Sequence, residues 1–379
     1  MALLRTTSPH LHGPRTTQHV MQQVLLATVP GLLALLWHFG WGSLINIVIA
    51  SSTALACEAG IVAARKRPVW FYLRDCSALV TAVLIGLALP PLVPWWVVVV
   101  GTAFAIVIAK HLYGGMGYNP FNPAMVGYVV LLISFPIEMT TWPAAHSILA
   151  TDLNPPGLWE TIRIAFQFSG SFELSGHTVD AFTAATPLDN FKSNNGLLVE
   201  QFYQQDAWFA AGRWAGAGWE WVNLGFLAGG CYLLYKKIFT WHAPVAMLSA
   251  LTLLAWLNND GGSSVSNGPA SLHLLSGATM LGAFFIVTDP VTSAVSNTGR
   301  LIYGALTGVL IFVIRVWGNY PDAVAFAVLL MNFAAPFIDY YTLPRTYGHQ
   351  NQGQKKPAKH GPGTTDSGNS RLNQPESKE

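Results

Sequence analysis

The sequence is poor in charged residues. Only 10% of its 379 residues are Asp, Glu, Lys or Arg, whereas 52% are hydrophobic. A soluble domain carries about 25% charged residues, so this shortfall argues against a soluble globular protein and predicts a polytopic membrane protein. The formal net charge of +2 carries no information about nucleic acid, which we do not expect as a partner.

The sequence is also poor in cysteine. Its three cysteines, Cys57, Cys76 and Cys231, lie far apart and form no C-x-x-C pair. This spacing excludes an obvious zinc or iron–sulfur site within this chain alone, and equally a disulfide framework. We therefore predict no metal site. No cleavable small-residue site follows the first apolar run, so the start of the chain does not look like a signal peptide. We therefore expect residues 1–19 to form a cytoplasmic tail.

Long apolar runs fill most of the chain. A membrane-spanning helix needs about 20 mostly apolar residues. Ten runs are predicted to be such helices: 20–38, 43–64, 76–92, 94–110, 122–138, 219–237, 242–257, 271–288, 300–316 and 321–340. Tryptophans cluster near several run ends, as is typical of the membrane–water interface. We therefore expect an all-α polytopic membrane protein.

The basic residues alternate from one connection to the next. Connections 39–42, 258–270 and 317–320 contain no Lys or Arg. The alternate connections and the C-terminal tail hold most of the basic residues: Arg65, Lys66, Arg67, Arg74, Lys110, Lys236, Lys237, Arg300, Arg345, Lys355, Lys356, Lys359, Arg371 and Lys378. The positive-inside rule then predicts that both termini are cytoplasmic and that the long connection 139–218 lies on the outer face.

The two halves of the chain resemble each other. Residues 122–135 align with 320–333, and the runs opening at Ser77 and Ser276 also correspond. Because each half has five spans, the repeats must face opposite ways across the membrane. The expected organisation is a first five-helix repeat, a polar loop, a second repeat and a disordered cytoplasmic tail, with bounds 20–138, 139–218, 219–345 and 346–379.

Charged residues within the runs are functional candidates because they are costly in lipid. Glu58 is the deepest, and Asp289 lies near the end of the eighth run. Both are candidates for an ion path. A helix–helix hydrogen bond or a pair with a basic neighbour explains Glu58 equally well, and an interfacial ion pair beside Arg300 is the favoured interpretation of Asp289. Lys110 and Arg315 lie at opposite faces, and we expect their charged ends to reach the interface.

The polar loop holds the candidate cofactor site. A threonine hydroxyl can form a phosphoester, and flavin mononucleotide (FMN) ends in a phosphate. Attachment needs an exposed, extended segment, and Pro187 favours that conformation at Thr186. On spacing alone, ordinary loop threonines with Asp189 capping a short helix are the favoured alternative. The residues that fit an attachment sequence are Asp180, Thr183, Ala185 and Thr186.

A second threonine, Thr279, follows a superficially better sequence, Ser276-Gly-Ala-Thr. The residue six positions before it is His273 rather than an acid, and Thr279 opens an apolar run. Inside a helix its hydroxyl would bond back to a carbonyl, and no enzyme could reach it. We therefore favour Thr186.

Five segments resemble a known family. They are Lys110–Gly115, Asn119–Met125, Ala185–Asp189, Thr288–Val291 and Asp339–Arg345. These segments resemble the RnfD family, the D subunits of Rnf ion-translocating electron-transport complexes. The resemblance extends over about residues 8–348. The family is related to the corresponding membrane subunit (NqrB) of the sodium-pumping NADH:quinone reductase. In that family an Asp-x-x-(Ser/Thr)-x-Ala-Thr motif carries FMN on its last threonine, which corresponds to Thr186. The usual Ser and Gly are replaced here by Thr183 and Ala184, a mild departure.

The resemblance implies a translocase subunit of a bacterial inner membrane, without a complete active site of its own. It would relay electrons through FMN on a periplasmic loop, while electrons pass between NADH and ferredoxin and sodium or protons cross the membrane. The implied partners are iron–sulfur, NADH-binding and second covalent-flavin subunits of the complex, membrane lipid and, during maturation, a flavin transferase. The resemblance leaves open a second, non-covalent flavin such as riboflavin.

Two other functions compete with this one. Inverted five-helix repeats also suit a solute channel or transporter, and solute uptake by flavin-free protein would support that interpretation. A purely structural anchor subunit would instead leave electron transfer intact when Thr186 is changed.

Overall fold

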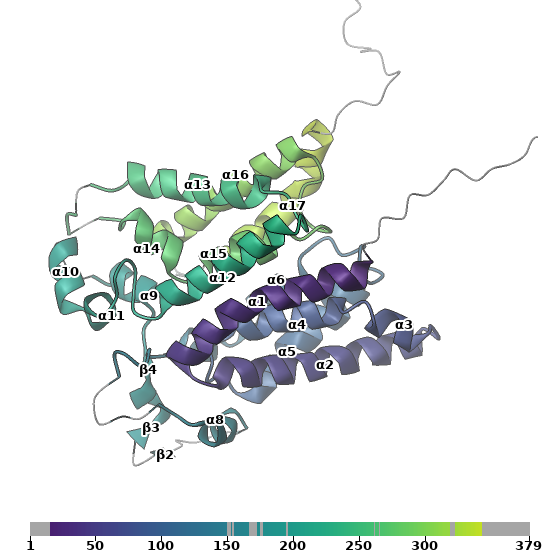
Figure 1. The fold of residues 1–379 in the computed structure, drawn as a ribbon, viewed down its shortest axis with the longest axis horizontal. Helices are drawn as coiled ribbons and strands as arrows, with labels where there is room; N and C mark the ends of the chain where they lie inside the picture. The colour runs from purple at the N-terminus through teal and green to yellow at the C-terminus, as the bar shows by residue number, and fades with distance from the viewer. Residues whose placement is uncertain are drawn as a thin grey trace, which may run out of the picture. The chain divides into compact units, whose positions relative to one another are not determined.

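A computed structural model describes residues 16–342 of the chain except 150–152, 154, 167–172, 175–176, 195, 261, 265 and 319–322. For residues 173–174 and 177–180 it describes the backbone alone. All of these residues belong to one compact unit, Met1–Leu343. Their regular structure is almost entirely helical (Figure 1).

The elements fall into three consecutive groups. The first is α1 (Thr17–Phe39), α2 (Gly42–Ala64), α3 (Val69–Leu73), α4 (Ser77–Ala88), α5 (Trp95–Phe104), the π-helical segment η1 (Ala105–His111) and α6 (Pro123–Ser134). The second is α7 (Pro136–Thr140), β1 (Trp142–Pro143), α8 (Leu158–Ala165), β2 (Glu173–Leu174), β3 (His177–Thr178), the 3₁₀ turn η2 (Val179–Phe182), β4 (Thr183–Ala184), α9 (Pro187–Lys192), α10 (Val199–Gln205) and α11 (Ala207–Ala210). The third is α12 (Trp219–Tyr235), α13 (His242–Leu257), α14 (Ala270–Leu275), α15 (Thr279–Leu281), the π-helical segment η3 (Gly282–Ile286), α16 (Asn297–Trp317) and α17 (Val324–Thr342).

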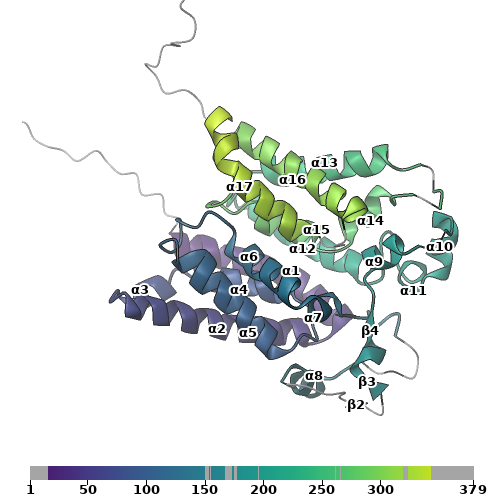
Figure 2. The same ribbon diagram turned by 180° about the vertical axis from the view of Figure 1, so that it is seen from behind.

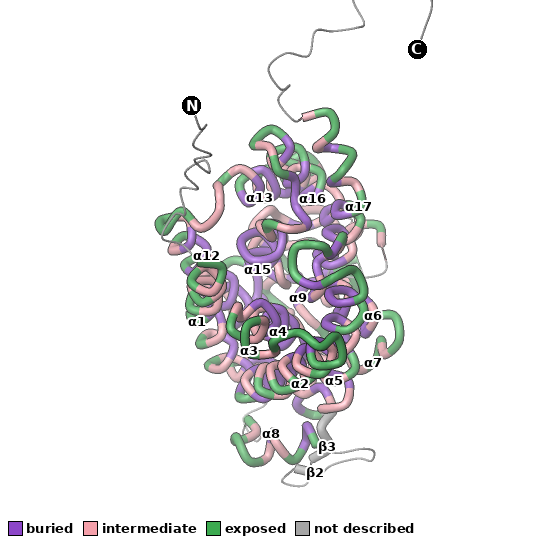
Figure 3. The backbone as a smooth tube through the Cα atoms, turned by 90° about the vertical axis from the view of Figure 1, so that its right-hand side faces the viewer, coloured by how far each residue is buried: buried purple, intermediate pink, exposed green. Residues whose placement is uncertain are grey.

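The helices have the composition of membrane spans. By length and composition α1, α2, α16 and α17 can each cross a membrane, and α4, α5 with η1, α6 and α13 are shorter apolar helices. Viewed along the bundle, the buried segments lie in the middle and exposed ones along the rim (Figure 3). The rim includes large apolar side chains such as Trp37, Phe333 and Phe337. Lipid rather than water suits such faces, so the prediction of a polytopic membrane protein is confirmed.

Small residues allow the helices to pack closely. α1 packs against α12, α2 against α4, and α13 against α16. At two of these crossings, Gly229 faces the Ala27 carbonyl and Gly304 faces the Ala243 carbonyl, with no room for a Cβ atom. Glycine at such positions lets two backbones approach and gain dispersion energy, which drives helix association in lipid.

The predicted span 271–288 is not one helix. α14 ends at Leu275, and the chain resumes helical structure only at Thr279, after Gly277 adopts a left-handed φ of 63°. The side-chain amide of Asn223 in α12 satisfies the exposed backbone: its nitrogen donates to the Leu275 and Gly277 carbonyls, both at 3.0 Å, and its oxygen accepts from the Met280 amide at 3.1 Å. Irregular backbone survives at membrane depth only with such partners.

The corresponding run in the first half is also shorter than predicted. The expected span 76–92 forms only α4, because Leu89 is extended and Pro90 cannot continue the hydrogen-bonding pattern. The Asn46 side chain of α2 donates to the Pro90 carbonyl at 2.9 Å. In each half, therefore, a buried asparagine from another helix satisfies the backbone where the third apolar run is interrupted.

The long connection between the halves is partly ordered. β1 pairs with β4 and β2 with β3, both antiparallel. These strands and α8–α11 gather at one end of the helical bundle, whereas α3 and the far end of α17 lie at the opposite end (Figures 1 and 2). The connection therefore brings Thr186 to one end of the bundle.

Candidate functional site

Local pairing and one proline fix the backbone at Thr186. Strand β1 aligns Trp142 with Ala184 and Pro143 with Thr183, which positions the chain just before the candidate residue. Thr186 itself is the N-cap of α9, with φ −67° and ψ 159°, and Pro187 is the first helical residue. The predicted extended conformation at Thr186 is confirmed.

The Thr186 hydroxyl is paired with Asp189. The hydroxyl donates to the Asp189 carboxylate Oδ2 at 2.7 Å and accepts from the Asp189 backbone amide at 3.3 Å. The alternative prediction named Asp189 as the cap of a short helix. The helix is present, but its N-cap is Thr186, so the predicted cap residue is wrong. A threonine directly before a proline that opens a helix is the sequence signal for this cap.

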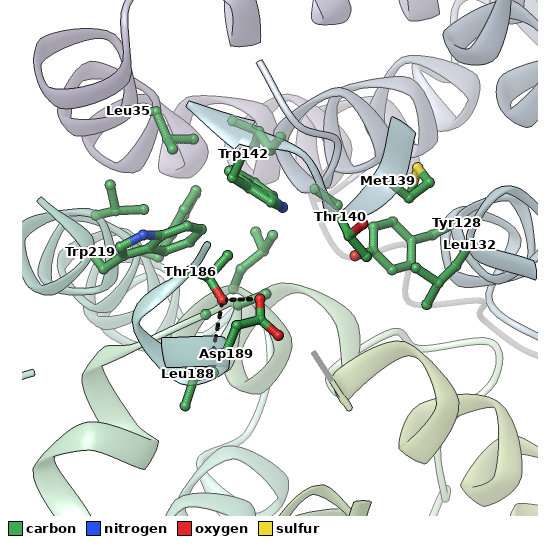
Figure 4. A pocket seen from close by; sticks show the side chains of 17 residues that line it. Leu35, Tyr128, Leu132, Met139, Thr140, Trp142, Thr186, Leu188, Asp189 and Trp219 are labelled. Carbon is green, nitrogen blue, oxygen red and sulfur yellow. Dashed lines mark hydrogen bonds between the residues drawn. The ribbon is translucent and has the colours of Figure 1, made fainter. Parts of the chain in front are cut away.

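Thr186 and Asp189 line a small, largely apolar cavity of about 60 Å³, whose wall includes several aromatic side chains (Figure 4). Trp142 and Trp219 lie beside Thr186, and their rings pack at a centroid distance of 4.9 Å. Tyr128 and Met139 form part of the wall beyond Asp189. The sequence did not identify these wall residues, because they come from α6, α7, β1 and α12, far apart along the chain.

The other residues of the attachment motif, which precede Thr186 in the chain, differ in how exposed they are. Ala185 is exposed and Thr183 is half-buried in β4, so small, accessible backbone precedes the hydroxyl. Asp180 lies in the turn η2, but its side chain is outside the described residues, as is any contact it makes. The structure thus places Thr183, Ala185 and Thr186 in one accessible strand-to-helix turn.

The second candidate, Thr279, is completely buried. Its hydroxyl donates to the carbonyls of His273 at 2.8 Å and Ser276 at 3.1 Å, and accepts from Arg315 Nη2 at 2.9 Å. The prediction that this hydroxyl bonds back to a carbonyl is confirmed. Thr279 holds together the break between α14 and α15 and is not accessible to an enzyme.

The two cations expected to reach the interface are buried instead. Arg315 is 4% exposed, and its Nη1 donates to the His273 carbonyl at 2.6 Å. Lys110 is 3% exposed, and its Nζ lies 2.7 Å from Glu58 Oε1 and 2.7 Å from Ser77 Oγ. The prediction of snorkelling is wrong for both, because partners in other elements compensate burial of the charge.

Glu58 therefore pairs with a basic neighbour. His111 Nε2 also lies 3.4 Å from Glu58 Oε1. Lys110 and Asp289 both line a second cavity of about 700 Å³ near the other end of the bundle. Asp289 accepts from the Thr292 hydroxyl at 2.7 Å and from the Val291 amide at 3.3 Å, so this carboxylate also stabilises the turn after η3.

Two groups of the connection have shifted pKa values. Burial raises the pKa of Tyr203 well above its ordinary range. Burial lowers the pKa of His146, against a smaller opposing effect of a hydrogen bond to the Trp37 backbone. Neither side chain lines the cavity at Thr186, so both effects concern packing of the connection rather than the candidate site.

Comparison with known proteins identifies the family. The model of the NQR2, RnfD, RnfE family matches residues 4–348. The chain belongs to this family. A Cellvibrio japonicus protein, named as the D subunit of an ion-translocating oxidoreductase complex, is 59% identical over 351 residues, covering 92% of this chain and 96% of the relative. Relatives with the same name from Pseudomonas aeruginosa PAO1 and Citrobacter koseri are 54% and 50% identical, covering 92% and 91% of this chain and 97% and 98% of their own.

The matched region includes every described helix and the whole connection that carries Thr186. The family resemblance seen in the five sequence segments is therefore confirmed over the whole described part of the chain.

Proposed function

We propose that this protein is the membrane subunit of a redox-driven ion pump and relays electrons through FMN bound by a phosphoester to Thr186. The complex would couple electron transfer between NADH and ferredoxin to sodium or proton movement. Relatives that cover almost the whole chain are named as the D subunit of an ion-translocating oxidoreductase complex. The observation that carries the proposal is a half-buried threonine, next to the exposed Ala185, that lines a cavity with two tryptophans.

The residues around Thr186 fit such an attachment. The hydroxyl lies in an extended segment beside the exposed Ala185, as the attaching enzyme requires. Trp142, Trp219 and Tyr128 offer apolar aromatic surface for a planar ring. A pocket that encloses a drug-sized ligand has about 300–1,000 Å³, so the 60 Å³ cavity supplies a wall for the ring rather than a closed container.

Asp189 is placed to assist the attachment. Forming the phosphoester joins Thr186 Oγ1 to the FMN phosphorus, breaks the bond from that phosphorus to the leaving phosphate group of an activated flavin donor such as a flavin dinucleotide, and removes the hydroxyl proton. The carboxylate oxygen that accepts this hydrogen bond lies 2.7 Å away. Asp189 would therefore both orient the hydroxyl and take its proton. Once bound, the flavin would supply one- and two-electron redox chemistry, which no described side chain of the site offers.

The test is mass spectrometry of the peptide containing Thr186, from the complex expressed with its flavin transferase. Attached FMN adds about 438 Da through a phosphoester. We expect this mass on the wild-type peptide, its loss in Thr186→Ala, and its retention in Thr279→Val. A bare Thr186 in a complex that transfers electrons would overturn the proposal. Solute uptake by flavin-free protein would favour the transporter instead.

The finer features of topology also belong to this proposal. We infer ten spans in two inverted repeats, cytoplasmic termini and a periplasmic Thr186 loop. Support comes from the distribution of Lys and Arg and from α9, which Thr186 caps, lying at the opposite end of the bundle from α3 (Figure 1). Labelling of a cysteine placed at exposed Ala185 by a membrane-impermeant reagent added to spheroplasts tests the loop's side; protection from the reagent would contradict it.

An ion path through Glu58 and Asp289 is a further part of the proposal. Both carboxylates lie near the 700 Å³ cavity, Asp289 in its lining and Glu58 through its partner Lys110. Glu58→Gln and Asp289→Asn should change the cation dependence of pumping at unchanged flavin content. Unchanged cation dependence in both variants would exclude these residues from the path. The presence of a second, non-covalent flavin stays a prediction.

A further inference from the structure

The segment that joins α2 to α4 combines exposed charge with exposed aromatic rings. We call residues 65–74 the basic–aromatic segment; it includes the short helix α3. Trp70 and Phe71 in α3 are 76% and 73% exposed. Four cations flank or precede them, and all are exposed: Arg65, Lys66, Arg67 and Arg74. Large exposed aromatic side chains beside several cations suit a partner that offers both apolar surface and negative charge.

Acidic side chains of the described chain do not neutralise the positive charges of this segment. Arg65 donates to the His111 carbonyl at 2.5 Å, and Arg67 donates to the Tyr72 hydroxyl at 3.3 Å and lies 6.0 Å from the centre of its ring. Within the described part of the chain, none of the four lies within 4 Å of a carboxylate. The nearby acid, Asp75, accepts hydrogen bonds from the Ser77 amide and hydroxyl. The segment therefore carries excess positive charge.

The length of α2 fixes the depth of this segment. α2 has 23 residues, or about 34 Å at 1.5 Å per residue, slightly more than a hydrocarbon core of about 30 Å. Residues just beyond its end at Ala64 therefore lie at the level of the lipid headgroups. Figure 1 shows α3 at the end of the bundle where α2 ends. Because α4 returns into the bundle at Ser77, we expect the basic–aromatic segment to stay at that level along its length.

We propose that the basic–aromatic segment binds the headgroups of anionic phospholipids. Trp70 and Phe71 enter the boundary between headgroups and acyl chains, where aromatic rings are favoured. Lys66, Arg67 and Arg74 meet the lipid phosphates, each contributing about a fivefold increase in affinity near an anionic surface. The segment thereby anchors the end of α2 and the start of α4, whose Ser77 contacts the buried Lys110.

The occupant is lipid rather than an acidic protein surface because of where the rings lie. Both exposed rings belong to a five-residue helix immediately after a membrane-spanning helix, at headgroup depth. A protein partner that needed only charge complementarity would gain nothing from Trp70 and Phe71. An acidic partner subunit is therefore the alternative that the experiment must separate from lipid.

The experiment uses the intact complex reconstituted in vesicles that contain a photoactivatable phosphatidylglycerol, or a phosphatidylcholine with the same acyl chains and photoreactive group. Cross-linked peptides are identified by mass spectrometry. Phosphatidylglycerol should label the peptides of residues 66–74 more strongly than phosphatidylcholine does. The double variant Arg67→Gln/Arg74→Gln should lower this labelling about 25-fold in a phosphatidylglycerol titration.

Lys236→Gln is the matched control, since it removes a cation from a different connection and should leave labelling of the segment unchanged. A size-exclusion profile identical to the wild type shows that the double variant still assembles. Equal labelling by the two lipids would overturn the proposal, as would wild-type labelling of the double variant. Carbodiimide coupling of Lys66 to a carboxylate of another protein in the complex, with no lipid label on the segment, would show that a protein occupies it.

Discussion

Two threonines with similar sequence surroundings have opposite environments. Thr186 lies at the edge of a cavity and shares its hydrogen with a carboxylate that belongs to the next turn of chain. Thr279 is completely buried and receives a hydrogen bond from a buried guanidinium. The two hydroxyls therefore differ in burial and in one distant partner, because Arg315 of α16 binds Thr279, whereas the described bonds of the Thr186 hydroxyl are to Asp189 alone.

The largest effect on stability should come from the cation that anchors Thr279. Arg315→Met leaves the His273 and Ser276 carbonyls and the Thr279 hydroxyl without this donor in a buried site, which should cost about 3 kcal/mol or more. Chemical denaturation of the purified complex in detergent measures the loss. Arg213→Met removes an exposed guanidinium and is the control. Wild-type stability of Arg315→Met would refute the anchoring role.

A smaller loss should follow when Thr279 itself is changed. Thr279→Val keeps the shape but removes a hydroxyl with three partners, and should cost about 1–3 kcal/mol while Thr186 keeps its flavin. Thr252→Val is the matched control, because within the described chain the Thr252 hydroxyl bonds only to the Leu248 carbonyl of its own helix. A loss of covalent flavin in folded Thr279→Val protein would reverse the assignment of the two threonines.

The stability loss at Thr186 should be smaller again, although its chemical effect is complete. Thr186→Ala removes the N-cap of α9 and should cost about 0.5–2 kcal/mol, with no covalent flavin left. Thr186→Ser keeps a hydroxyl and should retain both cap and flavin. In-gel flavin fluorescence after denaturation, together with denaturant titration, separates the two effects. A fluorescent band for this chain in Thr186→Ala would contradict the attachment site.

The smallest effect on stability should come from Asp189. Asp189→Asn keeps the size of the side chain and the backbone amide that binds Thr186, so it should cost less than about 1 kcal/mol. Flavin attachment in vitro should nevertheless slow by about 10²-fold or more, because the proton acceptor is lost. The initial rate with purified transferase measures this. A wild-type rate with an unchanged pH profile would limit Asp189 to holding the Thr186 hydroxyl in place.

Local sequence features predicted the backbone conformation at Thr186 better than they predicted the residues around it. Pro187 restricts Thr186 whatever the tertiary fold, and a threonine at the start of an apolar run tends to bond back to its own backbone. The tryptophans of the cavity could not be predicted, since Trp142 and Trp219 meet only after the chain folds. Asp189 carried a detectable signal in the Thr-x-x-Asp spacing, but the sequence alone suggested the wrong cap.

The helical membrane architecture followed from composition, whereas its interruptions did not. Hydropathy averages over a window, so the run 271–288 looked continuous although Gly277 breaks it. The compensating amide of Asn223 lies more than 50 residues away in sequence. For the same reason the burial of Lys110 could not be deduced, because its partner Glu58 comes from another helix.

The amide of Asn223 has a mechanical consequence. One side chain of α12 is fastened to backbone groups on both sides of the helix break, and it also bonds to the Trp219 carbonyl one turn earlier. Sliding α12 along its axis by even one residue would rupture these bonds together. Trp219 and Gly277 both line the cavity at Thr186, so α12 and this part of the cavity wall must travel as a single rigid piece.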